Sequence, residues 1–180
     1  MNQPQTGVYA EPNLHGITIL LNVMTDDVEV MQRKIARIPQ LLDGLEQRFS
    51  EAMLNGLVAI GSDYWDVLYP EVRPLQLSGF PDCSDGDRQT PRESADLLMS
   101  IRSDRFDVNF LAARTLLEWL GHDVEVIDQI NTFRYLDGRD LFGFIEAPDN
   151  PHGMRRRDVS VIHDDPVFQG SSYLFTQKFR

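Results

Sequence analysis

The order of the expected strands and helices constrains the fold of this chain more than any other feature of its sequence. Residues 15–24 form an apolar, β-branched run that predicts a buried strand. Residues 28–49 carry apolar side chains at intervals of three and four, which predicts an amphipathic helix with a proline, Pro39, inside it. Residues 54–60 predict a second strand, which ends at a Gly-Ser-Asp sequence.

A second unit of the same kind follows. Residues 96–102 predict a strand, residues 107–120 a helix that Gly121 closes, and residues 124–135 an interrupted strand. Strand, helix, strand repeated in this way is the split βαβ pattern of a ferredoxin-like α+β sandwich. We therefore predict an antiparallel sheet with helices on one face, forming a domain over residues 1–150.

The end of the chain follows a different pattern. Residues 158–162 and 171–179 predict strands, with no helix after them to cover their apolar side chains. We therefore predict that residues 151–180 are a connector and the opening strand of an incomplete second ferredoxin-like half. An open apolar strand invites pairing with another chain, so a homo-oligomer is one expectation. Residues 70–91 predict a long surface loop of unassigned chemistry.

Charge and composition exclude several classes of partner. The formal net charge of −11 disfavours nucleic acids and anionic lipid surfaces, and we interpret the single basic run, Arg155 to Arg157, as solvated. Cys83 is the one cysteine, which excludes a disulfide framework. No apolar leader or membrane-spanning run is present, so we predict a cytoplasmic protein without a membrane partner.

Three segments carry a family resemblance: Asp104 to Arg114, Phe133 to Tyr135 and, above all, Gly138 to Pro151 (GRDLFGFIEAPDNP). They resemble dye-decolorizing haem peroxidases of the bacterial, non-secreted type, in which the last segment reads close to RDL-x-GF-V-D-G-T-E-N-P. The similarity extends through Ser171 to Phe179. It covers nearly all of this chain and about half of a typical family member.

The resemblance implies a fold of two ferredoxin-like halves with haem b between them. It also implies that the proximal histidine and the distal arginine belong to the second half, so neither has a position in this chain. The distal acid position falls on Glu146, in place of aspartate. The resemblance places five further residues on the haem side of the same loop, namely Gly143, Phe144, Ile145, Ala147 and Asn150.

An acidic side chain beside haem can move the proton that cleavage of the O–O bond of peroxide requires. Glu146 retains this chemistry and reaches one methylene further than aspartate. Ala147 replaces a glycine of the family loop and adopts positive φ at a higher cost. Pro148 also departs from the family pattern, and we expect it to restrict Ala147 to extended conformations.

Other candidate side chains give weaker indications. His15, His122, His152 and His163 do not match the family's ligand position, and surface histidines are the commoner case, so we predict no metal site. The sequence contains no G-x-S-x-G elbow, P-loop or G-x-G-x-x-G motif. Trp65 and Trp119 lie beside apolar helical neighbours, and we predict core positions for both rather than electron-relay sites.

Three functions stay open at this point. The first is a haem peroxidase that oxidises organic donors in its complete form, here truncated, unable to turn over alone and without stably bound haem. The second is a catalytically silent ferredoxin-like module that dimerises or binds a partner chain, such as a missing C-terminal half. The third is a carrier of haem or another small planar ligand without turnover.

Overall fold

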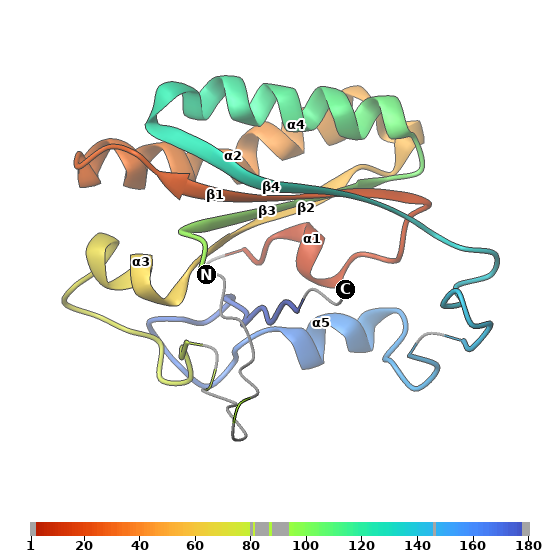
Figure 1. The fold of residues 1–180 in the computed structure, drawn as a ribbon. Helices are drawn as coiled ribbons and strands as arrows, with labels where there is room; N and C mark the ends of the chain where they lie inside the picture. The colour runs from red at the N-terminus through yellow and green to blue at the C-terminus, as the bar shows by residue number, and fades with distance from the viewer. Residues whose placement is uncertain (1–2, 80, 82–86, 88–93, 146, 178–180) are drawn as a thin grey trace.

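A four-stranded antiparallel sheet in the order β2-β3-β1-β4 forms the centre of the molecule (Figure 1). The structure, a computed structural model, describes residues 3–79, 81, 87, 94–145 and 147–177. In chain order its strands are β1 (His15–Val23), β2 (Asn55–Ile60), β3 (Leu97–Ser103) and β4 (Val124–Phe133). This order is that of a ferredoxin-like sheet and confirms the predicted fold class.

Strand β1 lies between β3 and β4. Its side chains on the helix-covered face, such as Ile17 and Ile19, are buried, and those on the other face, such as Thr18 and Leu20, are half-buried. Ile17 pairs with Ile101 of β3 on one side and with Asn131 of β4 on the other. The register of the β1–β4 pair shifts between Leu20 and Leu21. Such an irregularity increases the local twist of a sheet.

Two helices, α2 (Val28–Arg48) and α4 (Phe106–Leu120), cover one face of the sheet (Figure 1). The side chain of Asp27 caps α2 by accepting a hydrogen bond from the amide of Val30 at 3.0 Å. Gly121, with a φ of 64°, ends α4 as the sequence predicts. Pro39 lies inside α2, where its ring removes one backbone donor.

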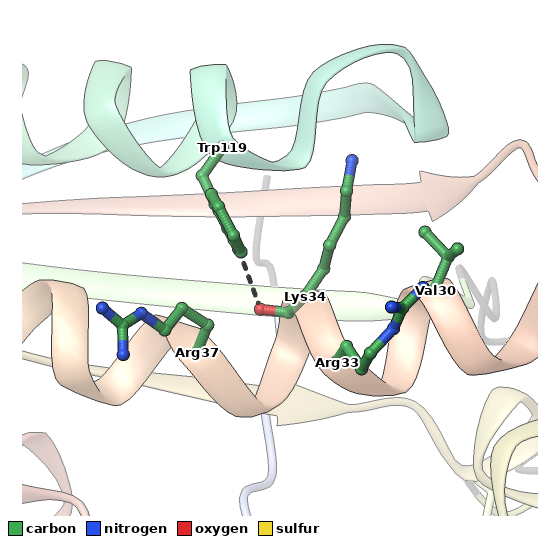
Figure 2. Close-up of a pocket in the computed structure, with 5 residues that line it drawn as sticks. All are labelled: Val30, Arg33, Lys34, Arg37 and Trp119. Carbon is green, nitrogen blue, oxygen red and sulfur yellow. Dashed lines mark hydrogen bonds between the residues drawn. The ribbon is translucent and has the colours of Figure 1, made fainter.

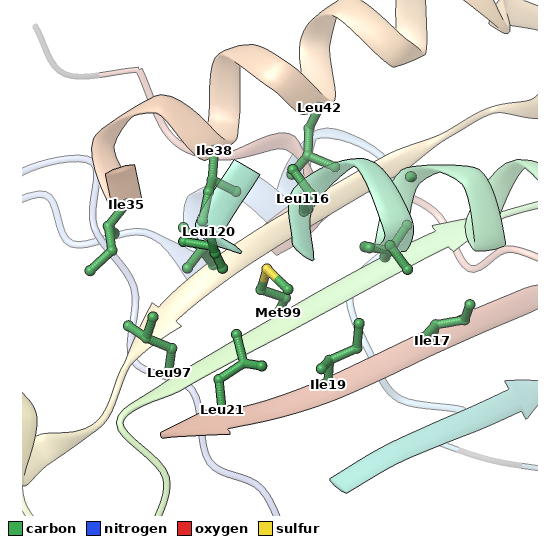
Figure 3. Close-up of a cluster of buried hydrophobic side chains, with 14 of the residues drawn as sticks. Ile17, Ile19, Leu21, Ile35, Ile38, Leu42, Leu97, Met99, Leu116 and Leu120 are labelled. Carbon is green, nitrogen blue, oxygen red and sulfur yellow. The ribbon is translucent and has the colours of Figure 1, made fainter. Parts of the chain in front are cut away.

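The hydrophobic core fills the space between this sheet face and the two helices (Figure 3). Strands and helices contribute side chains at the predicted spacings, and each fully buried aliphatic side chain stabilises the fold by about 2 kcal/mol. The labelled members are Ile17, Ile19, Leu21, Ile35, Ile38, Leu42, Leu97, Met99, Leu116 and Leu120. The apolar residues of the amphipathic patterns are therefore the ones that pack together in this core.

The second face of the sheet is partly covered by the N-terminal arm, which the sequence did not predict to be structured. A short helix, α1 (Thr6–Tyr9), packs against β2, and its Gly7 lies so close to Gly56 that an added Cβ would stand 2.3 Å from the Gly56 carbonyl carbon. The side-chain amide of Gln5 donates to the Val58 carbonyl at 2.9 Å and accepts from the Val58 amide at 2.8 Å.

Short elements connect the layers. The 3₁₀ turn η1 (Ser50–Ala52) precedes β2, the helix α3 (Ser62–Leu68) follows it, and the 3₁₀ turn η2 (Gly121–Asp123) leads into β4. Most of residues 80–93 lie outside the described residues, including Cys83.

The prediction of a strand over residues 158–162 is wrong. Residues Met154–Ser160 form a helix, α5, on the second side of the sheet (Figure 1). Residues 171–177 form no strand either, and residues 178–180 lie outside the described residues. The β-branched run finds no partner strand here, so the backbone donors at 158–160 are satisfied locally in helical turns. The division at residue 150 stays a prediction.

Two further predictions concern exposure. Trp119 is 41% exposed, so its predicted core position is wrong, whereas Trp65 is half-buried and contacts Tyr69 and Phe168.

Within the described part of the chain, no helix is long and apolar enough to cross a membrane.

Candidate functional site

The segment between β4 and α5, residues 134–153, contains every residue that the sequence predicted for a site. We call it the β4–α5 loop. It begins where the amide of Arg134 donates to the Leu14 carbonyl at 2.8 Å, one step beyond the end of the β1–β4 pairing. The amides of Gly138 and Arg139 then both donate to the Tyr135 carbonyl, at 3.0 and 3.1 Å. Gly138 has a φ of 99°, which favours glycine at this turn.

Arg139 fixes the shape of the loop from inside. Its guanidinium contacts both carboxylate oxygens of Asp137, at 2.8 and 3.2 Å, and donates to the Gly143 carbonyl at 2.8 Å. A bridge pairs Arg139 with Ile145 in antiparallel fashion. The hydrogen bond from Arg139 holds the pKa of Asp137 below its usual range. Arg139 is therefore committed to the loop itself.

Asp140 organises the tip of the loop. Its carboxylate accepts hydrogen bonds from the amides of Phe142 and Phe144, both at 2.9 Å. Its own amide donates to the Phe144 carbonyl at 2.9 Å, and the Gly143 amide donates to the Asp140 carbonyl at 3.1 Å. Sequence reasoning missed the roles of Arg139 and Asp140, although an aspartate three residues before a glycine is a turn signal.

These polar contacts hold four large apolar side chains out in solvent. The exposed fraction is 78% for Leu141, 90% for Phe142, 75% for Phe144 and 54% for Ile145. We call these four residues the apolar tip. Large exposed apolar patches often mark binding surfaces, so the apolar tip is a candidate contact surface.

The predicted site residues divide between two turns. Gly143, Phe144 and Ile145 lie in the turn that Asp140 organises, with Gly143 at a φ of 96°. Ala147 and Asn150 lie in the next turn, where the Asn150 amide donates to the Ala147 carbonyl at 3.0 Å. Glu146, the predicted distal acid, lies outside the described residues.

The expectation that Pro148 would restrict Ala147 to extended conformations is wrong. Ala147 has a φ of 45°, in the left-handed region that favours glycine. The Asn150 amide donates to the Ala147 carbonyl and closes the turn that follows. The loop thus has a glycine-like backbone at the position where the family resemblance expects a glycine.

The histidines do not assemble into a metal centre. His15 lies edge-on to Phe106 with ring centroids 6.0 Å apart, and Nε2 of His163 is 3.0 Å from the Asp158 carbonyl oxygen. His122 and His152 are exposed. Within the described ranges, no group of three or more His, Cys, Asp or Glu side chains could hold a metal ion.

Arg156 departs from the prediction that Arg155 to Arg157 form a solvated run. Its side chain is largely buried and donates to the carbonyls of Ala10 at 2.8 Å and Pro151 at 3.0 Å. It also pairs with Glu11 at 3.1 Å. Burial, followed by the charge of Arg156, lowers the pKa of Arg102. Arg156 therefore fastens α5 and the end of the β4–α5 loop to the N-terminal arm.

Comparison with known proteins identifies the family. A model of the N-terminal region of Dyp-type peroxidases matches residues 5–134, which is most of the chain. The chain belongs to the Dyp-type peroxidase family. It is 33% identical over 178 residues to the dye-decolorizing peroxidase of Mycolicibacterium paratuberculosis, covering 98% of this chain and 50% of that protein.

Solved structures of Dyp-type proteins agree with this assignment. The fold matches a Dyp-type protein from Shewanella oneidensis with a TM-score of 0.89 and 37% identity, over 94% of this chain and 56% of the other. It matches a variant of Rhodococcus jostii DypB in complex with heme with a TM-score of 0.82 and 30% identity, over 93% and 55%. The chain thus spans about half the length of the Dyp-type relatives it matches.

Proposed function

We propose that this chain supplies the N-terminal half of a dye-decolorizing peroxidase active site, with the β4–α5 loop as one wall of its haem pocket. The observation that carries the proposal is the apolar tip, which polar contacts of Arg139 and Asp140 hold away from the core. Ligand pockets are lined mainly by apolar and aromatic side chains with a few fixed polar groups. A flat apolar macrocycle would bury the side chains of the tip.

The residues of the loop fit haem as a wall and not as a complete site. Phe142, Phe144 and Ile145 offer apolar contact, while the family resemblance assigns the iron ligand to the other half. When bound, haem supplies the oxidation of organic donors by hydrogen peroxide. This chain alone is therefore proposed to bind haem weakly and to turn over nothing.

Glu146 is the residue proposed to move a proton. The resemblance places its carboxyl at the distal acid position, and a carboxyl group there can take a proton from one peroxide oxygen and deliver it to the other. The left-handed backbone of Ala147 supports this placement, because it preserves the backbone that glycine gives the family loop.

The partner proposed for this chain is the remaining half of the fold, on the same polypeptide or on a separate one. That half would cover the apolar tip, which is otherwise exposed. Where it is absent, a second copy of this chain is proposed to cover the tip instead. The cytoplasmic location stays a prediction.

The test compares the 180-residue chain with a chimaera in which it replaces the N-terminal half of the Shewanella oneidensis relative. Each protein is titrated with hemin by absorbance and then assayed for peroxide-dependent dye oxidation. We expect a saturable Soret band and turnover from the chimaera and neither from the chain alone. A chimaera that folds, as judged by circular dichroism, yet takes up no haem would contradict the proposal.

The role of Glu146 is tested in the same chimaera. Glu146→Gln should retain the haem band and lose about 100-fold or more in turnover, the usual contribution of a general acid or base. Glu146→Asp should keep most of the activity, because it retains the carboxyl group. Turnover by the glutamine variant at the parent rate would exclude Glu146 as the proton carrier while leaving the haem assignment intact.

A further inference from the structure

A groove is formed by residues of α2 and α4, the two helices that lie across the sheet from α5 in Figure 1. Val30, Arg33, Lys34 and Arg37 of α2 and Trp119 of α4 line it, and its volume is about 340 Å³. We call it the α2–α4 groove. Its residues have no part in the proposed haem wall, and the predicted elements gave no reason to expect it.

The indole of Trp119 is fixed in this groove rather than loosely exposed. Its Nε1–H donates to the Lys34 carbonyl at 3.0 Å, across the two helices (Figure 2). The ring nevertheless remains 41% exposed. A fixed and partly exposed indole presents a surface on which another aromatic ring can stack.

Three cationic side chains surround this ring, and they differ in whether a carboxylate neutralises them. Lys34 is neutralised, because its Nζ lies 2.6 Å from a carboxylate oxygen of Asp123 and donates to the Leu120 carbonyl at 2.6 Å. Arg33 uses its Nε to contact the Glu29 carbonyl at 3.3 Å, and Arg37 contacts the neutral Gln40. Among the described residues, neither arginine forms an ion pair with a carboxylate.

The two arginines stand four residues apart on α2, where like charges repel each other. Figure 2 shows them on either side of the Lys34 carbonyl that the indole contacts. This concentration of unpaired cations is unusual for a chain with a formal net charge of −11. An anion bound between them would relieve the repulsion.

We infer that the α2–α4 groove binds a small planar aromatic anion. The ring of the ligand stacks on Trp119, and its carboxylate or sulfonate pairs with a guanidinium group of Arg33 or Arg37. The groove volume of about 340 Å³ is at the low end for ligand pockets, so it suits one or two fused rings rather than a large cofactor.

The experiment is a titration of the 180-residue chain with naphthalene-2-sulfonate, followed by two-dimensional ¹H–¹⁵N NMR. The chain has two tryptophans and therefore gives two indole Nε1–H signals. Trp65 serves as the internal reference, because it lies in α3 and its indole Nε1–H donates to the Val72 carbonyl instead. We expect the Trp119 signal to shift in a saturable way while the Trp65 signal stays in place. The neutral analogue naphthalene-2-methanol should bind at least several-fold more weakly.

Variants identify the charges responsible. The double variant Arg33→Gln/Arg37→Gln should weaken sulfonate binding about tenfold, the size expected for two exposed charge contacts. Arg114→Gln, on the exposed surface of α4, should bind like the parent, and added salt should weaken binding only where the arginines are present. An unshifted Trp119 signal, equal binding of the neutral analogue, or unchanged affinity in the double variant would each overturn the inference.

Discussion

Met53 is held in a conformation that its side chain does not favour. It has a φ of 53° and a ψ of 38°, in the turn between η1 and β2, and its side chain is exposed. Its carbonyl accepts hydrogen bonds from the side chains of Asn13 and Asn55. The backbone of Met53 therefore contributes to the fold, whereas its exposed side chain contributes little. We predict that Met53→Gly raises the free energy of unfolding by about 1 kcal/mol, measured by urea denaturation.

Met24 gives the matched control, because it is equally exposed but lies outside the residues with positive φ. Met24→Gly should lower the free energy of unfolding by about 0.5 kcal/mol, since glycine there only adds freedom to the unfolded chain. Equal effects of the two substitutions would show that the backbone of Met53 is not strained.

Asp107 gives a prediction on pH. The hydrogen bond from Arg105 holds the pKa of Asp107 below the ordinary 3.8. A carboxyl group whose pKa is lower in the folded state stabilises the fold above the ordinary pKa and ceases to do so as the pH falls through the lowered one. Asp107→Asn should therefore be slightly less stable than the parent at neutral pH, and the difference should vanish in acid. A stability difference that does not shrink at all as the pH falls from about 6 to about 2 would contradict this assignment.

At the scale of elements, the contact between α1 and β2 depends on the absence of one side chain. A Cβ on Gly7 would stand 2.3 Å from the Gly56 carbonyl carbon, closer than packed atoms allow. We predict that Gly7→Ala displaces α1 and lowers the free energy of unfolding by about 1 to 3 kcal/mol, as overpacking does. Hydrogen exchange should rise at Thr6 to Ala10 first.

Gly44 tests the same substitution where space is available. It lies in α2 with no atom within 4 Å of an added Cβ. Gly44→Ala should raise the free energy of unfolding by about 0.5 to 1 kcal/mol, because alanine favours the helix. A stable Gly7→Ala variant with an unchanged exchange pattern would mean that α1 does not pack against Gly56.

The sequence predicted those elements whose apolar spacing matches a shared core. The strands β1 to β3 and the helices α2 and α4 all carry such a pattern, whereas β4 was predicted as an interrupted strand and none of its side chains is buried. Pro39 did not prevent α2 from continuing. It did not predict α1 or α5, because both are short and depend on contacts distant in sequence, such as Arg156 with Ala10. Local pattern alone cannot report such contacts.

The candidate site was located by resemblance and not by periodicity. The resemblance assigned Gly143 to Asn150 to one loop on the haem side. In the structure, the described residues of that loop form two adjacent turns. The polar frame of Arg139 and Asp140 was missed, since a charged run in a loop has many possible partners. The groove beside Trp119 was missed because apolar neighbours in the sequence favoured a core position.

At the scale of the whole molecule, the apolar tip should decide how the chain behaves alone. Four large side chains exposed together favour association when no other surface covers them. We predict that the 180-residue chain self-associates in sedimentation velocity, and that Phe142→Asp/Phe144→Asp shifts it to a monomer.

Phe110 provides the control for this prediction. It is also exposed, but it lies on α4, on the opposite face of the sheet from α1 and α5. Phe110→Asp should leave the sedimentation profile unchanged. A parent chain that stays monomeric at tens of micromolar would show that the tip does not drive self-association.

The side-chain amide of Gln5 has one more consequence. Strand β2 is an edge of the sheet, and Gln5 occupies both backbone groups of Val58 as a neighbouring strand would. An unprotected edge is a template on which molecules stack into fibrils. A protease cut after Gln5 would remove both of these hydrogen bonds without touching the core, and the truncated protein would then expose an edge open to fibril growth.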